Sequence, residues 1–411
     1  MAVCAVVDLW ATGDASLDRI VIQTPHAVIP RGYFGVNIIN FPDTHTMPPT
    51  VVGSWRTFDA EWTKIEPSEG GWNFTRVDED VSEAGAANVD LDLVLSSTPT
   101  WASARPAENA LRSWQQQGSK AESASIGTWI TYVRRVAERY RGRVHTYELW
   151  NEPNLAASYT GTAATLSNLS RSAYAVLKAV DPTITVISPA FSPLGNQTFI
   201  SDFLADCGQE CFDVIGYHFY TEGGSPERMI DEVRNIRTLA AEHNLGQKAI
   251  WNTEAGYMIE SGRNARKNGF AAFRPKQHVL TGNESADFVV RAYVLGWALG
   301  MRRFCWYAWG EEHYAIVDDH GNTPKPATFA LINIAEWMTG KTMLSCSRSP
   351  RGIWNVRFRG GGHSYSVLWS DAGAQAVKLN HAMRALRIAF HESYPIQRQT
   401  IVNGSPIIMS D

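Results

Sequence analysis

Long apolar runs are missing from this sequence, and none approaches the roughly 20 residues that a membrane-spanning helix needs. An excess of charge of one sign is missing as well, because 37 basic residues stand against 41 acidic ones and the formal net charge is −4. A nucleic-acid-binding domain normally carries a strongly basic face. We therefore expect neither a membrane span nor a nucleic-acid partner.

Cysteine is scarce, with five residues in 411, and these are too scattered for a disulfide framework or a zinc site. Only Cys207 and Cys211 are close in sequence. They could bridge a loop, which would indicate an oxidising compartment, or remain two free thiols. The opening segment Ala2–Val7 lacks a basic n-region and is interrupted at Asp8, so it is a poor signal peptide. A periplasmic or secreted location is nevertheless favoured.

Motifs for metal and nucleotide chemistry are also missing. The 11 histidines are dispersed and form no His-Glu-x-x-His string. The glycine-rich stretch Gly360–Gly362 lies where a hairpin is expected, rather than between a strand and a helix. We therefore predict no cofactor and no metal site.

Residues 33–340 show short β-rich runs alternating with longer segments of helical period, which is typical of parallel βαβ units. Three of the helical segments, near 126–140, 166–180 and 286–297, have apolar residues at steps of three and four. The pattern predicts an α/β fold, a (β/α)8 TIM barrel. Its eight expected strands are 33–38, 54–58, 91–96, 144–150, 185–188, 214–219, 249–252 and 303–307.

Residues 341–411 show a period of two instead. Apolar residues alternate with polar ones over 354–358 and again over 364–367, on either side of Gly360–Gly362, which predicts an antiparallel hairpin. Asn403-Gly404 between two apolar runs predicts a second hairpin. We expect a small C-terminal antiparallel β-sheet domain, and residues 1–32 are an N-terminal extension that could add strands to it.

Two short strings carry the chemistry: Trp150-Asn151-Glu152-Pro153 ends the fourth predicted strand, and Trp251-Asn252-Thr253-Glu254 ends the seventh. In a parallel barrel the C-terminal ends of the strands meet at one mouth. Two carboxyl groups that converge there could cleave a glycosidic bond, one as acid and one as nucleophile. The alternative for the first string is a helix start, at which Asn151 caps and Glu152 complements the dipole.

These strings resemble clan A glycoside hydrolases, and their detail is most similar to glycoside hydrolase family 39. The resemblance covers most of residues 33–340. It implies a retaining O-glycosidase with Glu152 as general acid/base, Glu254 as nucleophile and Asn151 bound to the sugar 2-hydroxyl. The strand count, made without the resemblance, places both glutamates on the strands that the family uses.

The resemblance implies further substrate-binding residues. Arg56 would keep Glu254 ionised, although it could be only a salt bridge at the barrel mouth. In Tyr217-His218-Phe219-Tyr220, Tyr220 would donate to Glu254 and His218 would line the same subsite, or else be a satisfied core histidine. With 15 Trp in the chain, aromatic rings for stacking on sugars are available, although most large aromatics fill cores. Trp101 is a candidate wall, and Trp306 and Trp309 compete for the floor, with Trp309 favoured.

The substrate is predicted only as a class, an oligo- or polysaccharide and, among these, a bacterial exopolysaccharide. An exo-acting β-xylosidase-like enzyme is the alternative, and a carbohydrate-binding barrel or a transglycosidase is the alternative of another class. The long connection 256–284 carries five cations, Arg263, Arg266, Lys267, Arg274 and Lys276. They could favour an acidic sugar, or they could form a solvated basic loop.

Overall fold

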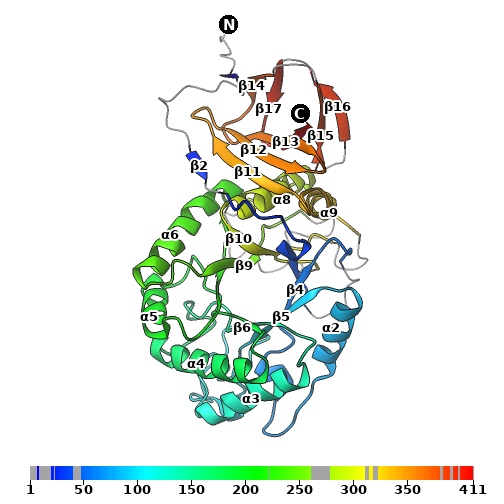
Figure 1. The fold of residues 1–411 in the computed structure, drawn as a ribbon. Coiled ribbons are helices and arrows are strands. Elements are labelled where there is room, and N and C mark those ends of the chain that lie inside the picture. Colours follow the sequence, from blue (N-terminus) through cyan, green and yellow to red (C-terminus); the bar gives the residue numbers. More distant parts are fainter. Residues whose placement is uncertain are drawn as a thin grey trace.

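A closed barrel of eight parallel strands forms the larger part of the molecule (Figure 1). The computed structural model describes residues 7–8, 20–22, 24–39, 48–221, 223–260, 278–310, 314–317, 323–379, 383–388, 392–396 and 399–410. The barrel strands, in spatial order, are β10 (Met301–Trp306), β3 (Phe34–Asn37), β4 (Ser54–Thr57), β5 (Asp90–Leu95), β6 (Thr146–Leu149), β7 (Thr185–Ile187), β8 (Val214–His218) and β9 (Ala249–Ala255). All eight predicted strands are present, and the predicted fold class is confirmed.

Helices surround the barrel, each with an apolar face against the strands. They are α2 (Thr75–Ala86), α3 (Ile126–Arg139), α4 (Ala163–Val180), α5 (Gln197–Cys207), α6 (Met229–Glu242), α8 (Gly282–Ala298) and α9 (Pro326–Met338), preceded by the short α1 (Trp62–Ile65). The three predicted helical segments correspond to α3, α4 and α8. In α3 the side chain of Ser125 caps the N-terminus by accepting a hydrogen bond from the backbone N–H of Gly127. None of the described helices is long and apolar enough to cross a membrane.

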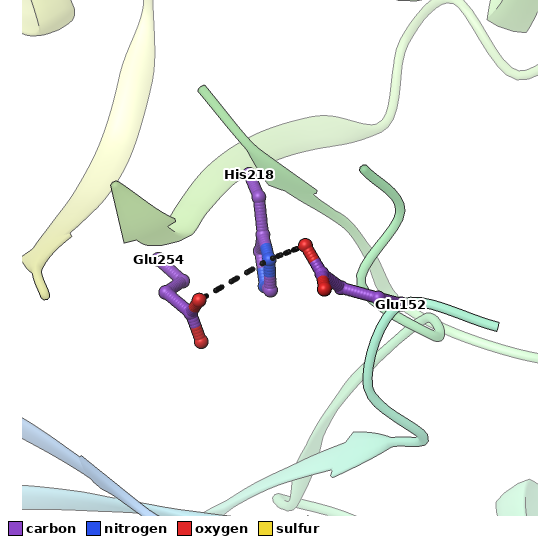
Figure 2. Close-up of side chains that lie close together, drawn as sticks. All are labelled: Glu152, His218 and Glu254. Carbon is purple, nitrogen blue, oxygen red and sulfur yellow. Dashed lines mark hydrogen bonds and ion pairs between the residues drawn. The ribbon is translucent and has the colours of Figure 1, made fainter. Parts of the chain in front are cut away.

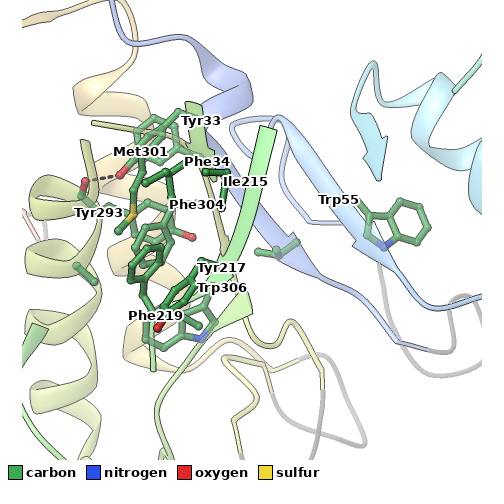
Figure 3. Close-up of a cluster of buried hydrophobic side chains, with 14 of the residues drawn as sticks. Tyr33, Phe34, Trp55, Ile215, Tyr217, Phe219, Tyr293, Met301, Phe304 and Trp306 are labelled. Carbon is green, nitrogen blue, oxygen red and sulfur yellow. Dashed lines mark hydrogen bonds between the residues drawn. The ribbon is translucent and has the colours of Figure 1, made fainter. Parts of the chain in front are cut away.

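Aromatic packing holds the first and last barrel strands against α8 (Figure 3). Tyr33, just before β3, donates its hydroxyl proton to the carbonyl of Tyr293 on α8, at 2.7 Å. Phe304 of β10 lies 4.7 Å from the same tyrosine ring. Gly35 is required where the strands close the barrel, because a Cβ there would lie 2.4 Å from the Ser54 hydroxyl oxygen. The barrel therefore closes where the Gly35 backbone lies close to the side chains of Ser54 and Cys305, and an apolar cluster packs the same strands against α8.

The C-terminal residues form antiparallel strands that lie beside α8 and α9 (Figure 1). Seven strands form one sheet in the order β16 (Glu392–Ile396), β15 (Met383–Arg387), β18 (Ile407–Ser410), β13 (His363–Ser370), β12 (Ile353–Gly360), β11 (Thr342–Arg348) and β2 (Ile20–Ile22). The predicted hairpin is β12–β13. Its turn residues Gly361 and Gly362 have φ of 58° and 80°, the backbone region that glycine adopts at no steric cost.

The second predicted hairpin is wrong. Asn403-Gly404 connects β17 (Gln399–Val402) to β18, but the two strands lie in different sheets: β17 pairs with β14 (Gln375–Lys378) in a three-stranded sheet. An Asn-Gly turn signal is local and does not say which partners the flanking strands take. Two N-terminal strands complete these sheets, since β2 pairs with β11 and β1 (Val7–Asp8) pairs with β14.

Candidate active site

Glu152 and Glu254 face each other across the C-terminal mouth of the barrel (Figure 2). Glu254 lies on β9, and Glu152 lies in the turn that follows β6. One oxygen of each carboxylate and one ring nitrogen of His218 lie within 4.8 Å of one another. Carboxyl groups of a retaining glycosidase lie about 5–5.5 Å apart, whereas an inverting enzyme needs about 6.5–9.5 Å to admit a water molecule. Three such atoms could also hold a divalent cation.

The turn that presents Glu152 has a strained backbone. Trp150 and Glu152 have positive φ values of 76° and 47°, and each such residue costs on the order of 1–3 kcal/mol. Backbone hydrogen bonds hold the conformation: the N–H of Trp150 donates to Leu95 on β5 at 2.9 Å, and the N–H of Glu152 donates to Ala190 at 2.8 Å. Neighbouring strand ends thus fix the direction of the Glu152 side chain.

Arg56 lies at the bottom of the site and forms ion pairs with Glu254 and Glu148. It is fully buried on β4 and donates to Glu254 at 2.8 Å, to Asn151 at 2.8 Å and to the amide oxygen of Asn37 at 2.9 Å. Its Nε and Nη2 both donate to Glu148 on β6. Burial disfavours a charged guanidinium, but Glu148 and Glu254 outweigh it, so the pKa of Arg56 is raised above its ordinary value. A permanent positive charge therefore lies against Glu254.

Tyr220 contacts the other side of the same carboxylate. Its hydroxyl donates to Oε1 of Glu254 at 2.7 Å. Burial, and then the charge of Glu254, raise the pKa of Tyr220 well above its ordinary value, so the phenol remains a hydrogen-bond donor. With Arg56 on Oε2 and Tyr220 on Oε1, both oxygens of Glu254 have a donor and the carboxylate plane is fixed.

His218 lies between the two catalytic candidates (Figure 2). Its Nδ1 is 3.1 Å from Oε1 of Glu152 and 3.8 Å from Oε1 of Glu254, and the ring is fully buried. Burial by itself would raise the pKa of Glu152, but the hydrogen bond and charge of His218 outweigh it, and the pKa lies below its ordinary value. Glu152 therefore favours the carboxylate form, the form of a general base.

Carboxylates inside the barrel do not reach the cavity. Glu148 is fully buried as the ion-pair partner of Arg56. Beneath it, burial and then the charge of Glu148 raise the pKa of Asp92 on β5 to about 8. Asp213 lies at the start of β8, at the opposite end of the barrel, where it pairs with Lys178 at 2.7 Å.

A cavity of about 540 Å³ opens above the carboxylates, within the size range of ligand sites in proteins. Its lining combines residues from the strand ends with residues of the loops after β4, β5 and β6. The lining residues are Ile39, Phe58, Glu61, Thr63, Lys64, Ser96, Ser97, Arg112, Trp114, Gln115, Gln116, Ser119, Trp150, Asn151, Glu152, Ser158, Glu254 and Tyr307.

The three proposed sugar-stacking tryptophans are absent from this lining. Trp101 donates its indole N–H to the carbonyl of Glu66 at 3.0 Å, and Trp62 contacts its ring. Trp306 is 1% exposed and packs edge-to-face on Phe288 in the cluster around α8 (Figure 3). Trp309 is 3% exposed. The structure therefore brings six of the nine predicted site residues together at the carboxylates and leaves these three outside the cavity.

Aromatic residues that we did not predict line the cavity instead. Tyr307, at the end of β10, lines the cavity between the two competing tryptophans in sequence. Trp114 also lines the cavity and is 70% exposed. Sequence analysis missed both. The available signal for Trp114 was the length of the connection from Ser96 to Ser125, because long loops at the C-terminal ends of barrel strands are usually functional.

The five cations of the connection 256–284 belong to residues 261–277, which lie outside the described residues. The hypothesis that Arg263 and its basic neighbours bind an acidic sugar therefore stays a prediction.

Cys207 and Cys211, whose pairing the sequence left open, form a disulfide at the end of α5.

Known proteins resemble both the sequence and the fold. Residues 113–295 match the family model described as the glycosyl hydrolase catalytic core. A family 39 glycoside hydrolase from Bacteroides cellulosilyticus WH2 is 16% identical with a TM-score of 0.68, over 93% of this chain and 81% of that one. A family 39 β-xylosidase from Caulobacter crescentus is 14% identical with a TM-score of 0.62, over 95% and 98%. A family 30 subfamily 8 xylanase from Clostridium acetobutylicum is 14% identical with a TM-score of 0.63, over 96% and 99%. No curated protein matches the sequence.

At these identities the solved structures establish a common fold, and the family model adds the catalytic core. Together they define a (β/α)8 barrel of the glycoside hydrolase class, with an attached β-sheet domain. Within that class the chain resembles the clan A enzymes of families 39 and 30, as the motifs around Glu152 and Glu254 predicted. The prediction that it is an O-glycosidase is confirmed at this level.

Proposed function

We propose that the protein is a retaining O-glycosidase in which Glu254 is the nucleophile and Glu152 is the general acid/base. The observation that carries the proposal is the approach of their carboxylate oxygens to within 4.8 Å across the barrel mouth. This spacing suits attack by one carboxylate while the other protonates the leaving oxygen. The resemblance to family 39 supports the same roles.

The first half-reaction follows from the contacts. Glu254 attacks the anomeric carbon while Arg56 and Tyr220 hold its two oxygens. The bond to the leaving oxygen breaks as Glu152 gives that oxygen a proton. Asn151 accepts from Arg56 through its amide oxygen, so its amide N–H groups are free to donate to the sugar 2-hydroxyl. Hydrogen bonds to this hydroxyl strengthen in the transition state and contribute several kcal/mol.

The second half-reaction uses Glu152 as a base. Water loses a proton to the Glu152 carboxylate and attacks the glycosyl ester at Glu254, which releases the sugar and restores the nucleophile. His218 lies in hydrogen-bond reach of Glu152. The proton taken from water restores the acid form of Glu152 for the next cycle, and the hydrogen bond with His218 fixes the position of that carboxyl group. We therefore assign His218 a positioning role.

Covalent trapping and product stereochemistry test the mechanism. A 2-fluoro glycoside should add the mass of one sugar to a peptide containing Glu254, and proton NMR should show retained anomeric configuration. Glu254→Gln should abolish both trapping and turnover. Asp213→Asn, at the opposite end of the barrel, is the matched carboxylate control and should keep turnover. Inverted product, or full turnover in Glu254→Gln, would reject the proposal.

For the substrate we propose an oligo- or polysaccharide, in particular a bacterial exopolysaccharide. Support comes from the cavity, which continues from Glu254 to the exposed ring of Trp114 and so offers room beyond the reacting sugar. The Caulobacter crescentus neighbour is a β-xylosidase, which favours the alternative of an exo-acting, β-xylosidase-like enzyme. Polysaccharide digests separate the two: falling chain length indicates internal cleavage, and single sugars without that fall indicate exo action.

A transglycosidase or a carbohydrate-binding barrel is the alternative of another class. A transglycosidase would keep both glutamates and the same covalent intermediate, but would pass the sugar to an acceptor hydroxyl faster than to water. Product analysis with and without added acceptor sugars distinguishes it from a hydrolase. A binding protein would hold sugars without any turnover.

The disulfide between Cys207 and Cys211 supports the proposed periplasmic or secreted location.

A further inference from the structure

A loop beside Glu152 carries a cation that no described carboxylate neutralises. Arg112 lines the cavity, and its guanidinium carbon lies 5.2 Å from the ring centre of Trp114. Within the described part of the chain, no Asp or Glu oxygen lies within ion-pair distance of this guanidinium, although such pairs form at Arg56, Lys64 and Arg105. Arg112 therefore brings an uncompensated positive charge to the cavity wall.

The other cation of the lining is already paired. The ammonium of Lys64 lies 3.2 Å from Asp59 and 3.4 Å from Glu61. These two carboxylates neutralise the charge of Lys64, so Lys64 attracts an acidic ligand only weakly. Glu152 and Glu254 add negative charge to the same space. An acidic sugar would be repelled there unless Arg112 receives its carboxylate.

Hydrogen bonds on two sides hold the loop in position. Gln115 accepts the backbone N–H of Arg112 at 3.2 Å and donates to the carbonyl of Ala157 at 2.8 Å. Gln116 donates to the carbonyl of Thr63 at 3.2 Å. The loop is thus tied both to the segment after Glu152 and to the helical turn after β4. A binding surface built in this way loses little entropy when a ligand arrives.

The location of the loop identifies the sugar that it would contact. Ala157 belongs to the segment that follows Glu152, and the charge of Arg112 acts on the Glu152 carboxylate. The acid/base gives its proton to the departing sugar oxygen. The end of the cavity beside Glu152, which Arg112 and Trp114 line, is therefore the end that receives the leaving group.

We propose that Arg112 and Trp114 form a subsite for a uronic acid residue on the leaving-group side of the scissile bond. The inference rests on the proposed glycosidase function and narrows its substrate to acidic polysaccharides. A guanidinium matches a carboxylate with two parallel hydrogen bonds. The exposed indole beside it offers a flat apolar surface to a sugar ring. Arg112 and Trp114 lie outside the segment 256–284. This inference is therefore independent of the hypothesis that the cations of that segment bind an acidic sugar.

Binding measurements in the Glu254→Gln background test the subsite. The probes are oligosaccharides that alternate glucuronic acid with a varied neutral sugar, and the same oligosaccharides with their carboxylates reduced to alcohols. Isothermal titration should show the acidic form binding roughly tenfold or more tightly, the size of one charge-assisted contact. Adding Arg112→Gln should remove this preference. Adding Arg134→Gln, the matched control, removes an exposed cation of α3 outside the cavity lining and should leave the preference in place. Trp114→Ala should weaken both forms alike.

Equal binding of the acidic and reduced forms, binding of neither, or a preference that survives Arg112→Gln would overturn the inference. The proposed function has a separate readout, turnover with retained configuration in the unaltered protein. An Arg112-dependent acidic preference in a protein that cleaves no glycoside would reject the glycosidase and keep the subsite. Cleavage without that preference would reject the subsite alone.

Discussion

His218 presents Nδ1 to Glu152 at 3.1 Å and to Glu254 at 3.8 Å, so one buried imidazole contacts both catalytic candidates. Its effect on Glu152 is the important one, because it lowers the pKa of a residue that must also act as an acid. A general acid with a lowered pKa loses its proton early as the pH rises. The contact therefore links the position of one histidine to the pH range of the reaction.

Replacing His218 should move the pH profile. In His218→Phe, burial of Glu152 is no longer opposed by the hydrogen bond and charge of the imidazole, so its pKa should rise. The alkaline limb of kcat/KM, which reports loss of the acid proton, should then shift to higher pH. His218→Asn, which keeps a neutral polar group, should shift it less. An alkaline limb that stays in place would show that His218 does not govern the proton on Glu152.

Arg56 should be indispensable for stability as well as for catalysis. Its removal leaves Glu148 fully buried with no cation, and breaking a buried ion pair costs about 3–5 kcal/mol. We expect Arg56→Met to lower the free energy of unfolding by about that amount, measured by urea denaturation. Arg56→Lys should recover only part of it, because an ammonium cannot bridge Glu148 and Glu254 as a planar guanidinium does.

A double variant separates charge from packing at this position. If the cost arises from the uncompensated Glu148, then Arg56→Met with Glu148→Gln should be more stable than Arg56→Met alone. If the losses of stability caused by Arg56→Met and by Glu148→Gln simply add in the double variant, the two sites act independently. The cost of Arg56→Met would then arise from lost packing.

The barrel strands and the main helices could be predicted because their signals are local. Parallel strands buried on both faces appear as continuous apolar runs, and helices such as Ile126–Arg139 show one apolar face. The ends of the fourth and seventh strands then placed Glu152 and Glu254 correctly at one mouth. Position within a closed barrel follows from strand count, so no tertiary information was needed for this pair.

The remainder of the site depends on geometry that sequence does not encode locally. Near the end of β10, Trp306, Tyr307 and Trp309 differ in the direction of their side chains, and Tyr307 is the one that lines the cavity. Arg112 and Trp114 lie in a loop without any periodic pattern, and only hydrogen bonds to distant segments place them. Loop contacts and strand-end directions are therefore what the structure adds.

Asp92 should make the stability of the protein fall as the pH rises. Burial and the charge of Glu148 raise its pKa in the folded state to about 8, against about 3.9 in an unfolded chain. Between these two pKa values the folded state binds more protons than the unfolded state. The contribution of Asp92 to stability is therefore complete below about pH 4 and is lost as the pH approaches 8. Asp92→Asn should remove this slope and be more stable at pH 7 by on the order of a few kcal/mol. Parallel stability curves for the two proteins from pH 4 to 8 would contradict the assignment.

Tyr220 should contribute to catalysis through one hydrogen bond. Its hydroxyl donates to Oε1 of Glu254 at 2.7 Å, and a hydrogen bond to a charged group is worth about 1.5–3 kcal/mol. Tyr220→Phe should therefore lower kcat/KM roughly ten- to a hundredfold while the fold is retained. Tyr217→Phe is the matched control, because Tyr217 lies on the same segment but packs on Phe219, 4.7 Å between ring centres, in the apolar cluster. Equal loss of activity in both variants would show a general disturbance of β8, whereas loss confined to Tyr220→Phe would show that the orientation of the Glu254 carboxylate limits the reaction.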